Sequence, residues 1–166
     1  MSGITDINYD LFGTKAHIQF FGEPIGIDGI PSWAKRITVL FNGVSLSGTD
    51  NFLIQIGSGS VTTSGYNSVT GYGGTGSGAT APATSTSGFV CQNGASINVI
   101  YGNVLIHLFS NYTYVAAYTA GTIQSGSTPY YNVGGGSVTL SGALDRVKIL
   151  TTGTNTFTAG SINILY

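Results

Sequence analysis

Hydrophobic and polar residues alternate with a period of two in several short stretches of this chain. The clearest stretch is 36–44, in which Ile37, Val39 and Phe41 are expected to share one face. Alternation over this length is typical of a β-strand with one buried face. Apolar residues at helical spacing are absent from every window of useful length, so the chain is predicted to be all-β.

The same pattern predicts nine short strands separated by glycine-rich turns. They lie at 17–21, 36–44, 52–56, 97–101, 104–109, 112–118, 137–140, 145–151 and 161–166, with a hairpin turn at Gly102-Asn103. Strands of this kind indicate an antiparallel β-sandwich with a jelly-roll-like topology. Residues 1–16 are expected to form an extended N-terminal arm, and residues 17–166 a single sandwich domain.

Two glycine-rich stretches are predicted to be long loops, at 71–88 and 121–136. Long connections without secondary structure are uncommon inside a compact domain and often carry function. We therefore expect these two loops to form the binding end of the domain.

The charge content excludes several classes of protein. Only 7% of the 166 residues are charged, against about 25% in an ordinary domain, and the formal net charge is -1. Such a chain has no electrostatic field that would attract nucleic acid.

The sequence also shows no sign of membrane insertion or secretion. No stretch reaches the roughly 18 apolar residues of a membrane helix, and residues 1–10 do not resemble a secretion signal. We expect synthesis in the cytoplasm and no insertion into a membrane.

Catalytic, metal and cofactor motifs are not apparent. Gly71, Gly73 and Gly76 have dinucleotide-loop spacing, but no crossover helix or acidic residue follows them as that motif requires. The two histidines, His17 and His107, lack further metal ligands at suitable spacing. A glycosidase built from the scattered carboxylates is the enzymatic alternative. The sequence favours a non-enzymatic module without cofactor or metal.

Three further residues are candidates for structural or interface roles. Trp33 follows Pro31 in a tight turn and is expected to be buried or at a subunit contact. Asp145 and Arg146 open an apolar strand. They form either an edge ion pair worth under about 1 kcal/mol, or a partly buried pair in which Arg146 reaches Asp28 or the Asp145 of a neighbouring subunit. The scarcity of charge elsewhere favours the second arrangement.

Several segments, taken together and in order, resemble the distal domain of tailed-bacteriophage tail-fibre and virion structural proteins. They are 30–39 (IPSWAKRITV), 42–45 (NGVS), 54–58 (IQIGS), 63–66 (TSGY), 86–89 (TSGF), 142–147 (GALDRV) and 156–166 (TFTAGSINILY). The resemblance implies a β-sandwich knob that assembles as a homotrimer on a virion. A fibre normally carries a long attachment region before this domain, whereas only the short arm precedes it here. The chain is therefore expected to be a fragment or a short knob attached directly to the particle.

Two functions follow from this resemblance. The first is a receptor-binding knob that attaches the virion to a host-surface glycan. Tyrosines near the predicted loops are its contact candidates, since tyrosine rings stack on sugar faces at small entropic cost; they are Tyr66, Tyr72, Tyr130 and Tyr131. The second is a capsid decoration protein whose arm docks on other virion proteins through Ile4, Ile7, Leu11 and Phe12.

Overall fold

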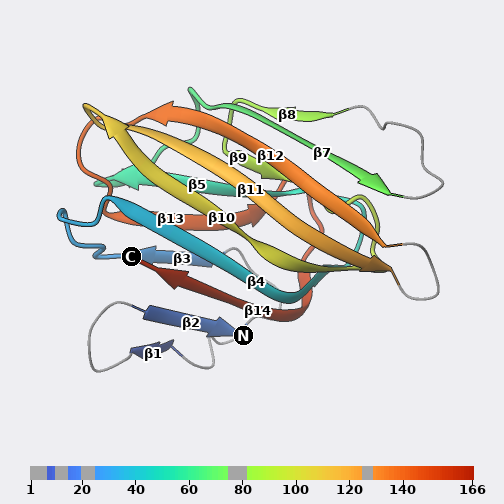
Figure 1. The fold of residues 1–166 in the computed structure, drawn as a ribbon. Helices are drawn as coiled ribbons and strands as arrows, with labels where there is room; N and C mark the ends of the chain where they lie inside the picture. Colours follow the sequence, from blue (N-terminus) through green and yellow to red (C-terminus); the bar gives the residue numbers. More distant parts are fainter. Residues whose placement is uncertain (1–6, 10–14, 20–24, 75–81, 125–128) are drawn as a thin grey trace.

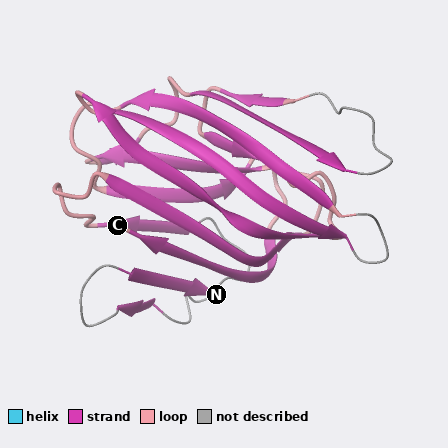
Figure 2. Cartoon of the chain, viewed as in Figure 1, coloured by secondary structure: helices cyan, strands magenta, loops and turns pink. Residues whose placement is uncertain are grey.

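The computed structural model describes residues 7–9, 15–19, 25–74, 82–124 and 129–166. Within these ranges the chain forms fourteen β-strands and no helix, arranged as two antiparallel sheets (Figures 1 and 2). The larger sheet has the order β1 (Ile7–Tyr9), β2 (Lys15–Gln19), β14 (Phe157–Leu165), β4 (Arg36–Leu46), β10 (Asn98–Ser110), β11 (Thr113–Gln124), β12 (Tyr130–Thr139), β7 (Asn67–Gly74) and β8 (Ala83–Ser85). The smaller sheet has the order β3 (Ile25–Asp28), β13 (Arg146–Thr151), β5 (Phe52–Ser58) and β6 (Ser60–Val61), and β9 (Phe89–Cys91) also pairs with β5.

The hydrophobic core lies between the two sheets. Phe52 of the smaller sheet is at its centre and is fully buried. Its ring contacts Phe41 at 5.1 Å, Tyr118 at 6.4 Å and Phe157 at 6.5 Å between centroids, and all three belong to the larger sheet. Tilted aromatic contacts of this kind add to the stabilisation that burial supplies. The prediction of an all-β sandwich is confirmed.

Strands with plain β-branched alternation lie close to their predicted positions, as β4, β5 and β13 illustrate. The predicted hairpin at Gly102-Asn103 is wrong, because β10 runs through both residues without a turn. The hairpin that joins β10 to β11 lies at Asn111-Tyr112 instead, where φ is 44° and 63°. Two central residues with positive φ suit the right-handed twist of a two-residue hairpin.

Both predicted loops contain strand residues, which corrects the predicted boundaries 71–88 and 121–136. Residues 71–74 continue β7, 121–124 continue β11, and β12 begins at Tyr130. Glycine serves here for close packing: a Cβ on Gly134 of β12 would lie 2.6 Å from the carbonyl oxygen of Val69 on β7. These glycines therefore mark a close approach of paired strands within the sheet.

Part of the predicted N-terminal arm forms edge strands of the larger sheet. β1 pairs with β2, β2 pairs with β14, and the predicted boundary after residue 16 falls inside β2. Ile7 is in β1, paired with Ile18. Ile4, Leu11 and Phe12 lie outside the described residues, so docking through the arm stays a prediction.

Candidate functional site

A polar pocket lies where the inner face of the larger sheet continues beyond the hydrophobic core. Strands β10, β11, β12 and β7 supply one wall, and the segment between β9 and β10 supplies the other. The lining residues are Tyr72, Asn93, Gly94, Ala95, Asn98, Thr122, Gln124, Tyr130 and Asn132. The cavity volume is about 70 Å³, which is room for roughly five water molecules. A pocket of this size holds one substituent of a ligand rather than a whole drug-sized molecule.

Carboxamide side chains form a hydrogen-bonded network along one side of the pocket. Gln124 Nε2 donates to Asn98 Oδ1 at 3.0 Å, and Asn98 Nδ2 donates to the Asn93 carbonyl oxygen. Asn93 Nδ2 in turn donates to the carbonyl oxygens of Gly48 at 3.0 Å and Ala95 at 3.1 Å. This network fixes the amide orientations, because a flipped Asn93 would set its oxygen against two other acceptors.

The opposite side of the pocket carries a second polar pair. Asn132 on β12 donates from Nδ2 to Thr122 Oγ1 on β11, and both residues are buried. Asn132 is directly opposite Tyr72 in the β12–β7 ladder. Inward-facing positions that are apolar in the core are thus occupied by amides and hydroxyls at this end of the sandwich.

Two tyrosines stand at the partly exposed side of the pocket. The rings of Tyr72 on β7 and Tyr130 on β12 meet edge to face, with centroids 5.5 Å apart and an interplanar angle of 81°. Both were predicted as receptor contacts, and the fold brings them into one pocket. Their phenol faces provide apolar surface beside the amide network.

The pocket chemistry favours an uncharged polar ligand. None of its lining residues is Asp, Glu, Lys, Arg or His. A charged group entering it would lose hydration without gaining an opposite charge, which is costly. A neutral ligand rich in hydrogen-bond donors and acceptors would exchange water for amide partners at little cost.

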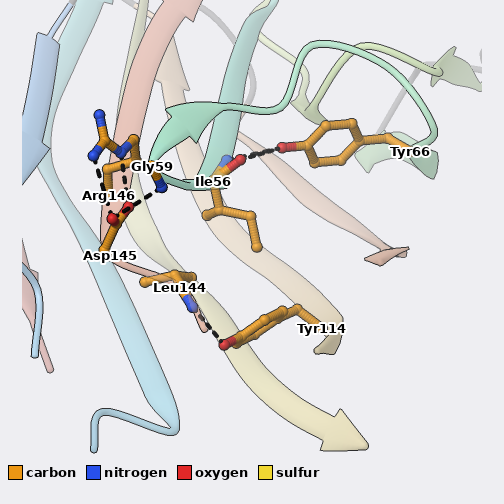
Figure 3. Close-up of polar contacts among 7 residues, drawn as sticks. All are labelled: Ile56, Gly59, Tyr66, Tyr114, Leu144, Asp145 and Arg146. Atoms are coloured by element: carbon orange, nitrogen blue, oxygen red, sulfur yellow. Dashed lines mark hydrogen bonds and ion pairs between the residues drawn. The ribbon is translucent and has the colours of Figure 1, made fainter. Parts of the chain in front are cut away.

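Tyr66 was predicted to be a receptor contact, and the structure corrects this. The side chain is only 2% exposed, and its hydroxyl is directed into the fold (Figure 3). The Ile56 backbone N–H donates to that hydroxyl at 2.8 Å, and the hydroxyl approaches the Ile56 and Thr62 carbonyl oxygens at 3.2 Å each. Burial raises the pKa of Tyr66 to about 12. Tyr66 therefore stabilises the fold and cannot contact a receptor from this position.

Tyr131 follows Tyr130 on β12 and projects from the opposite face of the larger sheet, 61% exposed. It belongs to the outer face of β7, β10, β11 and β12, which carries several other exposed apolar side chains. These are Val69, Tyr101, Leu105, Val115, Ile123 and Val133. The four predicted contacts are thus divided between the pocket, the outer face and the core.

Trp33 is 62% exposed in the turn before β4, so burial in the core of its own chain is wrong. The turn closes through the Ala34 N–H, which donates to the Pro31 carbonyl oxygen at 2.9 Å. Because this turn is compact without help from the indole ring, the ring is free to face outward. The predicted subunit contact at Trp33 stays a prediction.

Asp145 and Arg146 pair with each other within one chain (Figure 3). Arg146 Nε donates to Asp145 Oδ1 at 2.7 Å, and the Gly59 N–H donates to Asp145 Oδ2 at 2.9 Å. The hydrogen bond from Arg146 lowers the pKa of the Asp145 carboxyl. Asp28 is opposite Arg146 in the β13–β3 ladder and also favours the charged guanidinium. Arg146 thus pairs with Asp145 of its own chain rather than with Asp28, and the expected contact with a neighbouring subunit stays a prediction.

The remaining chemistry of the described residues is sparse. Among them, no three His, Cys, Asp or Glu side chains gather closely enough to hold a metal ion. Cys91 is fully buried, and burial raises the pKa of its thiol well above the ordinary value. The part of the chain that the structure describes contains no helix long and apolar enough to cross a membrane.

No protein-family model, curated protein or solved structure matches this chain. Any conclusion about function therefore rests on the sequence and structure of the chain itself. Sequence reasoning missed the five polar residues of the pocket: Asn93, Asn98, Thr122, Gln124 and Asn132. The alternation of sides along each strand could have revealed three of them. Asn98 is on the same inward side of β10 as Ile100, and Thr122 and Gln124 are on the same inward side of β11 as Ala120.

Proposed function

We propose that this chain is a non-enzymatic, jelly-roll-like knob of a bacteriophage virion that binds a host-surface glycan and assembles as a homotrimer. The observation that carries the glycan-binding proposal is the uncharged pocket formed by amide side chains and the Tyr72–Tyr130 pair. The virion assignment rests on the resemblance of the sequence segments.

Amides and aromatic rings together suit the surface of a neutral sugar. A sugar ring has one face of C–H groups, which packs on an aromatic ring, and an edge of hydroxyls that donate and accept hydrogen bonds. Tyr72 and Tyr130 provide the first kind of surface, and Gln124 and Asn132 provide the second. A pocket held by backbone ladders on four strands is also preorganised, which reduces the entropic cost of binding.

Self-association is supported by the outer face of the larger sheet. The strands 67–74, 98–110, 113–124 and 130–139 contain no Asp, Glu, Lys or Arg. Identical copies carry identical charge, so a face without charge meets a second copy without repulsion. Exposed Val115, Ile123 and Val133 supply apolar area on this face, and exposed apolar area is what a protein–protein contact buries.

The test of glycan binding is a glycan array with matched variants. We expect the wild type to bind a set of neutral glycans and Tyr130→Ala to lose them. Tyr131→Ala is the control, because it removes a neighbouring tyrosine from the opposite face. An array without wild-type binding, or equal binding by both variants, would contradict the proposed site.

The test of assembly is the mass in solution by light scattering. We expect a mass near three chains for the wild type and a smaller species for Val133→Lys, which places a charge in the outer face. A wild-type monomer would contradict the trimer.

A further inference from the structure

We infer that the pocket recognises the acetamido group of an N-acetylated neutral sugar. This inference rests on the proposed glycan binding and adds the ligand class. An acetamido group combines one hydrogen-bond donor, one acceptor and one methyl group within a few heavy atoms. The pocket has a complementary feature for each of the three.

The first feature is an acceptor without a donor. Asn93 is 4% exposed and lines the pocket, and its Oδ1 is buried with no hydrogen-bond partner among the described residues. Both Nδ2 hydrogens are donated to the carbonyl oxygens of Gly48 and Ala95, so the amide cannot turn over and present its NH2 group at the position of Oδ1. Buried polar atoms in native proteins nearly always have hydrogen-bond partners, so an oxygen without one is explained if a ligand supplies the missing donor. The N–H of an acetamido group is a donor of the right kind, and the Asn93 side chain would have to shift toward the pocket for that N–H to reach the oxygen, because the oxygen is covered from solvent.

The second feature is a set of unused donors beside that acceptor. Gln124 Nε2 uses one hydrogen for Asn98 Oδ1, and Asn98 Nδ2 uses one for the Asn93 carbonyl oxygen. Each amide nitrogen carries two hydrogens, so each has a second one for a ligand carbonyl. The carbonyl oxygen of the acetamido group is the matching acceptor.

The third feature is apolar surface at the same place. Ala95 lines the pocket, and the edge-to-face rings of Tyr72 and Tyr130 stand beside it. A methyl group packs against such surface, whereas a hydroxyl there would lose its hydration. The cavity volume of about 70 Å³ suits one small substituent while the rest of the sugar remains outside.

Charged sugars fit this pocket poorly. A carboxylate or ammonium group would be desolvated among neutral amides with no counter-charge among the lining residues. An unsubstituted hexose supplies hydroxyl donors but neither the methyl group nor the carbonyl. The pocket therefore discriminates at the position where the N-acetyl group is attached.

The experiment compares methyl glycosides of N-acetylglucosamine, N-acetylgalactosamine, glucose and glucosamine by NMR titration of the full chain. We expect the two N-acetylated sugars to bind about tenfold or more tightly than the other two. Gln124→Ala should remove most of that preference, and Tyr131→Ala should leave it unchanged. Circular dichroism and the unfolding midpoint check that each variant is folded.

The outcomes separate this inference from the proposed function. Equal binding of glucose and N-acetylglucosamine, or binding of other array glycans but of neither N-acetylated sugar, overturns the acetamido inference and leaves glycan binding intact. A wild-type protein that binds no sugar in the titration and no glycan on the array overturns both. If Gln124→Ala does not fold, the relative affinities of the wild type for the four sugars still test the acetamido inference.

Discussion

Removing the Tyr66 hydroxyl is the sharpest test of the packing described above. The Ile56 N–H lies on the edge of β5 between the segments that pair with β9 and with β6, so no strand accepts its hydrogen bond there. The Tyr66 hydroxyl accepts it instead at 2.8 Å. In Tyr66→Phe the ring remains, but a buried N–H loses its acceptor.

The expected cost of Tyr66→Phe follows from that orphaned donor. A buried unsatisfied N–H costs about 1–3 kcal/mol. The Ile56 carbonyl oxygen keeps the Thr62 N–H at 3.0 Å, so it adds little. We expect a loss of about 2 kcal/mol in the free energy of unfolding, or roughly 4–8 °C in Tm. Tyr66→Ala should lose about 3–5 kcal/mol, because it also removes the ring that meets Phe89 at 5.0 Å.

Urea denaturation of the two variants measures these losses, with Tyr131→Phe as the control for an exposed tyrosine. The control should change stability by less than about 0.5 kcal/mol. A Tyr66→Phe protein as stable as the wild type would refute the reasoning, because it would mean that the Ile56 N–H finds another acceptor.

Titration of Tyr66 adds a pH dependence to the same prediction. The folded state holds the Tyr66 pKa at about 12, against 10.0 for a free tyrosine. The folded state therefore binds the proton more tightly than the unfolded chain. Its contribution is fully present below pH 10 and is lost as the pH rises toward 12, with a slope of up to about 1.4 kcal/mol per pH unit. Tyr118 and Cys91 also have raised pKa values, so the difference between wild type and Tyr66→Phe isolates Tyr66.

Three further predictions concern single positions. Trp33→Ala should change the free energy of unfolding by less than about 0.5 kcal/mol in urea, because the indole is 62% exposed; a loss of several kcal/mol in the assembled protein would instead reveal a subunit contact. Asp145→Asn should cost under about 1 kcal/mol, since its pair with Arg146 is partly exposed. The lowered pKa of Asp145 means that this contribution is present above pH 3.8 and is lost as the pH falls through the folded value, and high salt should reduce it. Gly134→Ala should lower Tm by several degrees, because its Cβ would meet the Val69 carbonyl oxygen at 2.6 Å, a clash worth about 1–3 kcal/mol; an unchanged Tm would contradict the close approach of β7 and β12.

The strands that sequence reasoning found are those whose side chains carry the pattern. In β13 and in the first half of β4, buried apolar side chains alternate with more exposed ones, since one face packs on the core and the other does not. Period-two alternation is a local property, so it can be read without the fold. The all-β class followed from it.

The strands that were missed are those whose glycines are needed for close packing against a neighbouring strand. Gly134 is a strand residue because β7 pairs closely with β12 at this point, and nothing within 130–139 itself reveals that pairing. The same local pattern is typical of a loop. Glycine needed for close approach and glycine needed for a turn cannot be distinguished without the pairing partner.

The candidate site was half predicted for a related reason. Tyrosine composition pointed to Tyr72 and Tyr130, but it pointed equally to Tyr66 and Tyr131, which face the core and the outer surface. Direction depends on strand register, and a shift of one residue reverses it. The amides at Asn98 and Asn132 only become a cluster once β10 to β12 and β7 are aligned.

The place of β14 within the larger sheet governs the order in which the chain can be completed. β14 lies between β2 and β4, pairing Ile162 with Ile18 on one side and with Phe41 on the other. Both neighbours must wait for a partner that the ribosome makes about 140 residues after β2, roughly ten seconds or more at ordinary elongation rates. Until then β4 presents an open, apolar edge of the kind that recruits other nascent chains. Nascent chains stalled before residue 157 should therefore be the main aggregating species during expression, and slower growth temperatures or a chaperone that covers strand edges should raise the yield of folded protein.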